Sequence, residues 1–289
     1  MSETTAPTQI MGVLNVTPDS FSDGGRFFDP AKALAHGLEM LEAGADILDV
    51  GGESTRPGAV RVDEDEELRR VVPVVRELSA TGAVISVDTM RARVAEASLA
   101  AGAHIINDVS AGLSDPSMLG VAAAADVPIV LMHWRGHLER ADATFHYDDV
   151  VAEVLAELRE RIRDAGRAGV RPENIIVDPG LGFSKNAEHN WQILSALDEF
   201  APLGHRLLVA ASRKRFISSL LSPEDPTLAL ETEKDQATAV ISALAARAGA
   251  WAVRVHEPRS SAIACRVVAA IAAHARRGEA HTPAPEGRP

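Results

Sequence analysis

The chain has 289 residues, a formal net charge of -12 at pH 7, and 46% hydrophobic but only 4% aromatic residues. The negative charge argues against non-specific nucleic-acid binding, which requires an accumulated positive surface. No basic region followed by an apolar stretch opens the chain, and no apolar segment reaches membrane-spanning length, so the sequence predicts neither a secretory signal nor membrane contact. The single cysteine, Cys265, lies in an apolar helical pattern without a disulfide partner, which predicts a cytoplasmic location.

Eight short apolar runs rich in β-branched residues recur along the chain, each ending in polar or glycine residues. They comprise residues 10–16, 47–52, 84–89, 105–110, 129–134, 175–180, 207–212 and 251–256. Segments with helical periodicity lie between them, at residues 30–43, 64–79, 90–101, 117–125, 150–168, 190–199 and 234–248. Eight such alternations predict a single-domain α/β fold, a closed (β/α)₈ TIM barrel, with an open doubly wound sheet as the alternative.

The two ends of the chain differ in composition from this barrel domain. Residues 1–8 are polar and residues 277–289 are rich in Gly, Pro and charge, so we expect flexible ends around a domain at residues 9–276. A run of carboxylates at residues 63–67 precedes a helical segment, where it complements the dipole of the helix N-terminus. We interpret that run as a solvated cap without function.

Two Gly-rich polar loops each follow an apolar run directly. The first, at residues 15–25, reads NVTPDSFSDGG, and the second, at residues 51–58, reads GGESTRPG. A loop that combines glycine, hydroxyls, an amide and an arginine just past a buried strand is suited to close over an anionic substrate and to hold a metal–phosphate group. The loops therefore predict an enzyme.

Polar residues end nearly every predicted strand. They are Asn15, Asp49, Glu53, Asp88, Asn107, Asp108, His133, Asp178, Ser212, Arg213, Lys214, Arg254 and His256. The chemistry of such barrels takes place where the carboxyl ends of the strands meet. Because an unpaired buried polar group is costly, a ring of them predicts mutual hydrogen bonds or a polar ligand. The orientation of His133, toward or away from this mouth, stays open.

Residue types divide this ring into two groups. The first offers the acceptors that would complement the amino and N–H groups of a flat heterocycle, and it consists of Asp88, Asn107 and Asp178. The second would hold a phosphate-type anion, because Arg254 and His256 lie two apart on one strand and face the same side; it consists of Arg254, His256, Asn15 and Arg56.

Lys214 ends the seventh strand just before a helical segment at residues 216–221, whose backbone N–H groups would face an anion. A Schiff-base lysine is the alternative, since neighbouring cations lower the pKa of a lysine and make it nucleophilic. The flanking Arg213 and Arg215 would contribute to that lowering, but they suit a carboxylate or phosphate site equally well.

Motifs along the whole chain carry a family resemblance. Besides the two loops they read MGVL at residues 11–14, SVDT at 86–89, NDVS at 107–110, LMH at 131–133, DPGLGF at 178–183, SRK at 212–214 and RVH at 254–256. Over residues 9–275 this ordered set closely resembles the dihydropteroate synthase family. The resemblance implies condensation of 6-hydroxymethyl-7,8-dihydropterin diphosphate with 4-aminobenzoate, a step of folate biosynthesis that sulfonamides block.

The resemblance also implies a role for each residue singled out above. Pterin binding is implied for Asp88, Asn107, Asp178 and Lys214, with Met132 and Phe183 lining the pocket. Diphosphate binding is implied for Asn15, Arg56, Arg254 and His256, with Mg²⁺ as the cofactor and Asn15 as its ligand. Aminobenzoate contacts are implied for Phe21, Thr55, Pro57 and Arg215. The implied catalytic set is Asn15, Asp23, Arg56, Lys214, Arg254 and His256.

A dissociative, SN1-like displacement fits this assignment, because loss of diphosphate leaves a resonance-stabilised cation and the enzyme must mainly stabilise the departing charge and exclude water. The family also implies a homodimer. The chain departs from the family pattern at Ala210, where many relatives have Gly, at Arg215, where many have Ser, and at Glu257-Pro258. A pterin-dependent methyltransferase domain and a non-catalytic pterin-binding paralogue remain as alternatives.

Overall fold

In the computed structural model, which describes residues 7–17, 30–53, 62–136 and 146–279, eight parallel strands close into a barrel in sequence order. The strands are β1 (Gln9–Asn15), β2 (Ile47–Gly51), β3 (Val84–Asp88), β4 (Ile105–Asp108), β5 (Ile129–Met132), β6 (Ile175–Asp178), β7 (Arg206–Val209) and β8 (Ala252–Val255). Closure depends on the pairing of β1 with both β2 and β8. This topology confirms the TIM barrel and excludes the open sheet.

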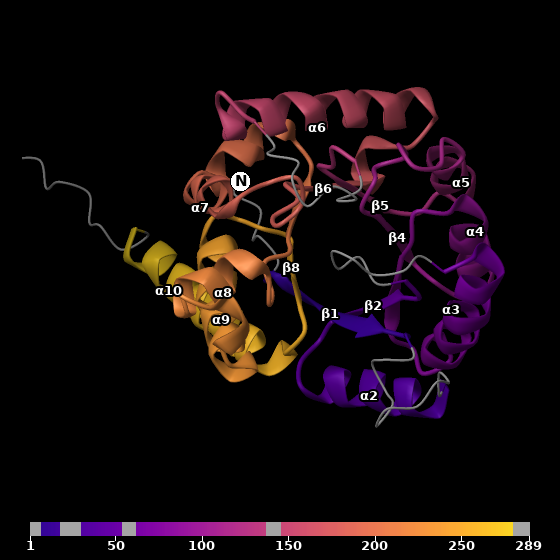
Figure 1. Cartoon of the computed structure of the whole chain (residues 1–289), viewed down its shortest axis with the longest axis horizontal. Helices are drawn as coiled ribbons and strands as arrows, with labels where there is room; N and C mark the ends of the chain where they lie inside the picture. The colour runs from indigo at the N-terminus through magenta and orange to yellow at the C-terminus, as the bar shows by residue number, and fades with distance from the viewer. Residues whose placement is uncertain (1–6, 18–29, 54–61, 137–145, 280–289) are drawn as a thin grey trace, which may run out of the picture.

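Helices surround the barrel on all sides (Figure 1). They are α2 (Pro30–Glu42), α3 (Glu64–Ser79), α4 (Ala92–Ala100), α5 (Met118–Ala125), α6 (Val150–Arg167), α7 (Ala187–Ser195), α8 (Arg215–Leu221), α9 (Glu231–Arg247) and α10 (Pro258–Glu279). Short 3-10 helices occur at Pro172–Asn174, Leu197–Leu203 and Pro226–Leu228. Within the described ranges, no helix combines the length and the apolar character needed to cross a bilayer.

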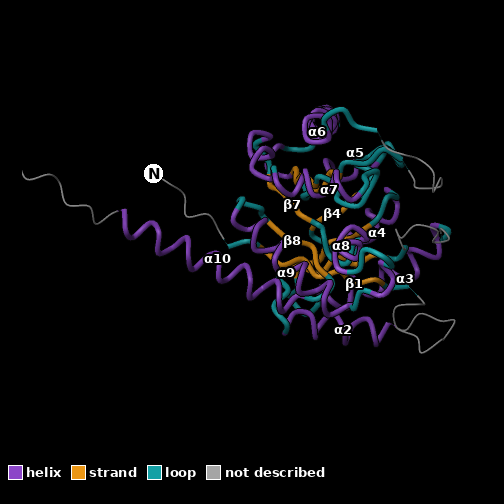
Figure 2. The backbone as a smooth tube through the Cα atoms, turned by 60° about the vertical axis from the view of Figure 1, so that its left-hand side comes forward, coloured by secondary structure: helices purple, strands orange, loops and turns teal. Residues whose placement is uncertain are grey.

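Helix boundaries differ from the predicted ones where a cap or a proline decides them. The segment predicted at 190–199 begins three residues earlier, because the Asn186 side chain accepts from His189 N at 2.8 Å, and it ends at Ser195 before a 3-10 turn that contains Pro202. Helix α10 extends from the barrel in Figure 2 and continues to Glu279, so residues 277–279 of the predicted tail are helical. The flexibility of the two ends stays a prediction.

The barrel interior contains two layers, which lie two residues apart along β2, β4, β6 and β8. The apolar layer, toward the amino ends of the strands, consists of Met11, Ile47, Ile105, Val130, Ile176, Leu208 and Ala252, all buried. Because side chains alternate along a strand, the next inward positions toward the carboxyl ends carry different residues. We call the charged and amide side chains among them the polar layer: Asp49, Asp88, Asn107, Asp178 and Arg254. The barrel is therefore a filled core with a polar floor at its mouth.

Candidate active site

The guanidinium of Arg254, on β8, lies at the centre of the polar layer. Its Nε donates to Asp49 Oδ2 and its Nη2 to Asp88 Oδ2, both at 2.6 Å. Asn107 Nδ2 donates to the same Asp49 oxygen at 2.9 Å. Four strands thus contribute to one hydrogen-bonded group, as the ring of polar strand ends predicted.

Asp88 is the titratable group of this floor. Burial raises its pKa to about 7, the cation of Arg254 lowers it, and the neighbouring carboxylate of Asp49 raises it. Its protonation therefore changes near neutral pH, and a ligand that offers N–H donors would favour the ionised form. This is the behaviour expected of a carboxylate that binds a heterocycle.

Asp178 ends β6, and Lys214 directly precedes α8 in the segment that follows β7. Gly180 N donates to Asp178 Oδ1 at 2.7 Å, and burial raises the pKa of Asp178 while Lys214 lowers it. Lys214 Nζ donates to Leu181 O and lies 4.6 Å from the ring centroid of Phe183. Burial lowers the pKa of Lys214 to about 8, so the ammonium form predominates at pH 7. That charge state favours an anion-binding or π-facing role over a Schiff base.

Arg213 does not contribute to this part of the mouth, contrary to the expectation from its place beside Lys214. Its side chain donates to Asp235 from Nε and Nη2, both at 2.8 Å, and lies 3.1 Å from Glu231. A positive φ of 55° at Arg213 accompanies this orientation. Arg254 is the cation that lowers the pKa of Lys214, after burial.

An apolar cluster borders the charged floor. Met90, Val109 and Met132 are buried together, and Trp134 and Phe183 pack against them. A flat ring would find acceptors on one side, at Asp88, Asn107 and Asp178, and apolar surface on the other. The predicted pterin-lining residues Met132 and Phe183 thus belong to one cluster.

The predicted anion-binding residues Asn15 and His256 lie at the carboxyl ends of two neighbouring strands. Asn15 ends β1, which pairs with β8, and His256 comes directly after β8. His256 Nδ1 lies 3.0 Å from Ser212 Oγ, which also accepts from His256 N at 3.1 Å. Arg215 is exposed at the first residue of α8. Asp23, Phe21, Thr55, Arg56 and Pro57 lie outside the described residues.

Comparison with known proteins agrees with this geometry. Residues 11–256 match the family of pterin binding enzymes. A dihydropteroate synthase of Mycobacterium leprae is 54% identical over 92% of this chain and 94% of its own length. The chain belongs to the dihydropteroate synthase family.

Solved structures of dihydropteroate synthases also resemble the chain. The Xanthomonas albilineans enzyme with 4-aminobenzoic acid has a TM-score of 0.83 and 44% identity, covering 92% of this chain and 94% of that one. The same enzyme in complex with 7,8-dihydropteroate has a TM-score of 0.81 and 41% identity over the same shares. A Yersinia pestis enzyme with a sulfonamide drug complex has a TM-score of 0.85 and 40% identity, covering 92% and 95%.

Two buried acids of this family member were not assigned a role from the sequence. Asp49 is fully buried and joins Arg254 to Asn107; its signal is a charged residue at an inward position of an otherwise apolar strand. Glu67 belongs to the predicted solvated cap, yet it is 1% exposed, contacts Arg91, and accepts from Thr89 Oγ1 at 2.6 Å. Of that run, Asp63 does cap α3, accepting from Glu66 N at 2.7 Å.

His133 points away from the polar layer. It is buried, its Nε2 lies 2.9 Å from Glu157 Oε2 on α6, and its Nδ1 lies 2.8 Å from Lys185 Nζ.

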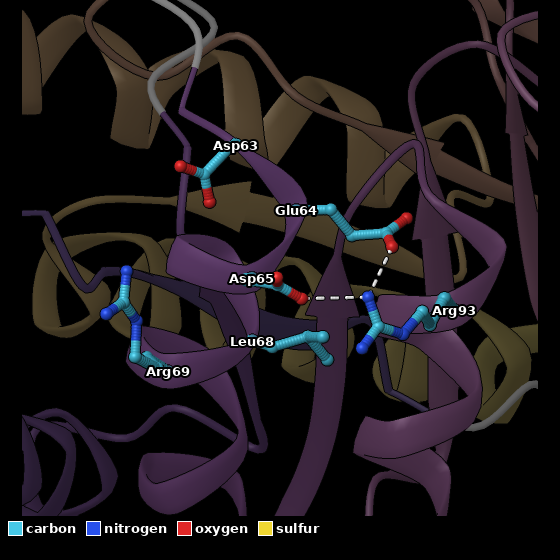
Figure 3. A pocket seen from close by; sticks show the side chains of 6 residues that line it. All are labelled: Asp63, Glu64, Asp65, Leu68, Arg69 and Arg93. Carbon is cyan, nitrogen blue, oxygen red and sulfur yellow. Dashed lines mark hydrogen bonds and ion pairs between the residues drawn. The ribbon is translucent and has the colours of Figure 1, made fainter.

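A surface hollow between α3 and α4 is also separate from the polar layer (Figure 3). In this hollow the guanidinium of Arg93 forms ion pairs with Glu64 and Asp65, both at 2.8 Å, so the positive charge of Arg93 is already neutralised by its neighbours.

Within the described ranges, no group of three or more His, Cys, Asp or Glu residues is arranged to hold a metal ion. The predicted ligand Asn15 supplies an amide oxygen at the mouth, a donor of the type that Mg²⁺ accepts. Since Mg²⁺ commonly completes its coordination with water and substrate phosphates, one such oxygen fits a metal that arrives with the diphosphate.

Proposed function

We propose that this chain condenses 6-hydroxymethyl-7,8-dihydropterin diphosphate with 4-aminobenzoate to give 7,8-dihydropteroate and diphosphate. The observation that carries the proposal is the polar layer at the barrel mouth, held by Arg254 between Asp49 and Asp88, in a member of the dihydropteroate synthase family. The 7,8-dihydropteroate complex of the Xanthomonas albilineans relative supports the product assignment.

The pterin ring occupies the floor in this proposal. Asp88, Asn107 and Asp178 bind its amino and ring N–H groups, and the cluster of Met132 and Phe183 contacts its faces. Because Asp88 and Asp178 are both held where burial raises their pKa, N–H donors of the ring would supply the hydrogen bonds that their ionised forms lack.

Arg254, Lys214 and His256 stabilise the charge that develops during the reaction. The C–O bond between the pterin methylene and the diphosphate breaks, the C–N bond to the aniline nitrogen forms, and that nitrogen then loses a proton. Ser212 Oγ lies 3.0 Å from Nδ1 of His256 and so helps to orient the ring that we assign to the departing diphosphate. Preorganised cations and N–H donors of this kind stabilise a leaving anion without reorganising. We propose that cleavage precedes attack, as in an SN1-like displacement.

Mg²⁺ is the proposed cofactor, with Asn15 as the residue that holds it together with the diphosphate. When bound, the metal supplies a positive charge that offsets the departing anion.

The roles of five further residues stay predictions. They are the proposed catalytic residues Arg56 and Asp23, and the proposed aminobenzoate contacts Phe21, Thr55 and Pro57. Arg215 would reach the carboxylate of aminobenzoate from α8. Sulfonamides are proposed inhibitors, since the Yersinia pestis relative forms such a complex.

A homodimer is part of this proposal. Val240 and Leu244 on α9 and Ile263, Val267 and Ile271 on α10 are all more than half exposed, and their four-residue spacing places them along one face of each helix. Large apolar patches are rare on monomers. Light scattering tests the assignment, because Val267→Glu should give a monomer; the unaltered protein running as a monomer would refute it. The cytoplasmic location stays a prediction.

Diphosphate release by the purified protein tests the function. With dihydropterin diphosphate and Mg²⁺ present, release should depend on added 4-aminobenzoate and should stop when EDTA removes the metal. Pterin binding without release would identify a non-catalytic paralogue instead. No pterin binding at all would refute the assignment of the floor.

A further inference from the structure

A lysine beside the pterin pocket has no part in the reaction described above. Lys185 lies between β6 and α7, in the loop that follows Asp178. Its Nζ is 2.8 Å from His133 Nδ1 and 3.1 Å from the carbonyl oxygens of both Gly180 and Phe183. These three atoms are acceptors for the three protons of an ammonium group.

The contacts of His133 define this charge state. Although burial raises the pKa of Glu157, hydrogen bonds from His133 and Arg135 lower it to about 2, so the carboxylate facing His133 Nε2 is ionised at neutral pH. Burial lowers the pKa of His133 to about 4, so its ring is neutral and carries one proton. That proton lies on Nε2, because Nε2 must donate to the carboxylate. Nδ1 is then an acceptor, and Lys185 must donate to it.

Burial and the charge of Lys214 lower the pKa of Lys185, yet the three hydrogen-bond contacts of its Nζ within the described residues are all to acceptors. A neutral amine would leave one of these acceptors without a proton. The acceptors therefore select the ammonium form. The negative charges of Asp178 and, beyond the imidazole, of Glu157 offset the ammonium charge, and Arg135 in turn holds Glu157, donating from Nε at 2.9 Å.

The loop that Lys185 contacts has an unusual backbone. Gly180, Gly182 and Ser184 have φ values of 69°, 77° and 51°. A Cβ at Gly180 would lie 2.2 Å from the carbonyl oxygen of His133, so the loop packs directly against the end of β5. A left-handed conformation is unfavourable for Ser184, which needs outside contacts to persist there. Tyr147 supplies one, donating from its hydroxyl to Ser184 O at 2.9 Å.

This loop also forms one side of the pterin pocket. It carries Leu181, whose carbonyl oxygen accepts from Lys214 Nζ, and Phe183, whose ring centroid is 4.6 Å from that nitrogen. A shift of the loop would therefore move the Phe183 ring together with the carbonyl oxygen that holds Lys214. Lys185 holds the loop at Gly180 and Phe183, on either side of Leu181.

We propose that Lys185 is a positioning residue for the pterin pocket: its ammonium group, oriented by His133 and Glu157, holds the β6–α7 loop so that Leu181 O and the Phe183 ring stay against Lys214. The inference rests on the proposed function, because it assigns the pocket to the pterin. It differs from a purely structural role in that the loop carries pterin contacts, so its loss should change pterin binding more than other steps.

Lys185→Met tests the proposal, since methionine keeps an apolar stem and removes the ammonium. Ile176→Ala is the matched control: Ile176 lies on β6, the strand that leads into the loop of Lys185, but in the buried apolar layer. For Lys185→Met the KM for dihydropterin diphosphate and the Kd for 7,8-dihydropteroate should rise at least about tenfold, as expected for lost charge-assisted hydrogen bonds. The KM for 4-aminobenzoate, measured at saturating pterin, should change less than about twofold, because its proposed contacts lie elsewhere.

Thermal unfolding of both variants separates positioning from folding. If Ile176→Ala lowers the Tm as much as Lys185→Met and raises the pterin KM equally, or if Lys185→Met raises both KM values alike, the proposal is wrong. If the unaltered protein binds dihydropteroate without turnover, the proposed function fails. The Kd values of Lys185→Met and of the unaltered protein for 7,8-dihydropteroate still test the role of Lys185.

A double-mutant cycle tests the link through His133. Glu157→Gln removes the charge that orients the imidazole, so it should weaken dihydropteroate binding by about threefold or more alone, but add little in the Lys185→Met background. Fully additive effects would show that Glu157 does not act through Lys185, and would overturn the proposed orientation.

Discussion

The apolar layer and the polar layer of the barrel interior share the strands β2, β4, β6 and β8, yet they contribute to the protein in opposite ways. Ile47 and Ile176 of the apolar layer are buried among other aliphatic side chains, whereas two residues further on Asp49 and Asp178 replace them with carboxylates. Among the described residues, Asp49 Oδ1 is buried without a hydrogen-bond partner. The polar layer thus accepts a cost in folding free energy that a ligand can offset.

The largest effect should follow from breaking the polar layer at its centre. Arg254→Met leaves the carboxylates of Asp49 and Asp88 without their shared cation, and removing one partner of a buried ion pair costs about 3–5 kcal/mol. Urea unfolding measures that loss. Diphosphate release should fall at least about 1,000-fold, since we also propose that Arg254 stabilises the leaving group.

If Arg254→Met and the unaltered protein have the same free energy of unfolding, the polar layer is not a charged group held by one cation. Arg254→Lys is the matched control, because it keeps the charge but has a single donor centre and cannot span both carboxylates. Its losses should lie between those of Arg254→Met and the unaltered protein.

A deletion in the apolar layer should affect stability and leave substrate binding intact. Leu208→Ala removes a fully buried side chain and should lower the free energy of unfolding by about 2–5 kcal/mol. Both KM values should stay within about twofold at a temperature where the variant is folded, because Leu208 lies in the layer beneath the polar floor and is not among the proposed substrate contacts. A selective rise in the pterin KM would show that the two layers are not separable.

Asp88→Asn should change stability and activity in opposite directions. Burial raises the pKa of Asp88 to about 7, above that of an aspartate in the unfolded chain. Between about pH 4 and pH 7 the unfolded chain therefore releases a proton that the folded protein retains, so rising pH destabilises the folded state at up to about 1.4 kcal/mol per unit. Stability contributed by the protonated form is fully present below this window and lost above it.

The asparagine variant lacks this titration, so its free energy of unfolding, relative to that of the unaltered protein, should rise from pH 4 to pH 7. Its pterin affinity should nevertheless fall at least about tenfold, because a neutral amide replaces the carboxylate that we propose accepts from the ring. Urea unfolding across this pH range, with Ile105→Val of the apolar layer as a control for general pH effects, measures the difference. Parallel pH curves for Asp88→Asn and the unaltered protein would contradict it.

The two layers also differ in how well the sequence predicts them. The apolar residues at period two and the eight alternations determine the strands, and the polar strand ends Asp88, Asn107 and Asp178 meet because parallel strands share one carboxyl end. The sequence does not predict which of the polar side chains pair, because the contact between Arg254 and Asp49 depends on how β8 lies relative to β2 after closure. The family resemblance implies diphosphate binding for Arg254, which stays a prediction, but it does not indicate that the guanidinium contacts the carboxylates of Asp49 and Asp88.

Local backbone geometry sets the remaining limit. Arg213 follows Ser212 in sequence, yet its positive φ turns its side chain to Asp235 on α9, which no pattern around residue 213 indicates. Glu67 is buried because Arg91, from the loop before α4, comes to meet it. In both cases the partner lies more than twenty residues away, and only the closed fold brings the two together.

The smallest effect should come from the edge of the mouth, at Ser212. Its Oγ accepts from His256 N at 3.1 Å and lies 3.0 Å from His256 Nδ1; donation of the Ser212 proton to Nδ1 would favour the neutral tautomer with its proton on Nε2. Ser212→Ala removes that preference, which should cost about 1 kcal/mol of stability and lower kcat by about three- to tenfold. The pterin KM should change little, because the floor is untouched. Ser212→Thr keeps the hydroxyl and should restore kcat; equal losses in both variants would assign the effect to packing beside His256 and not to the position of its proton.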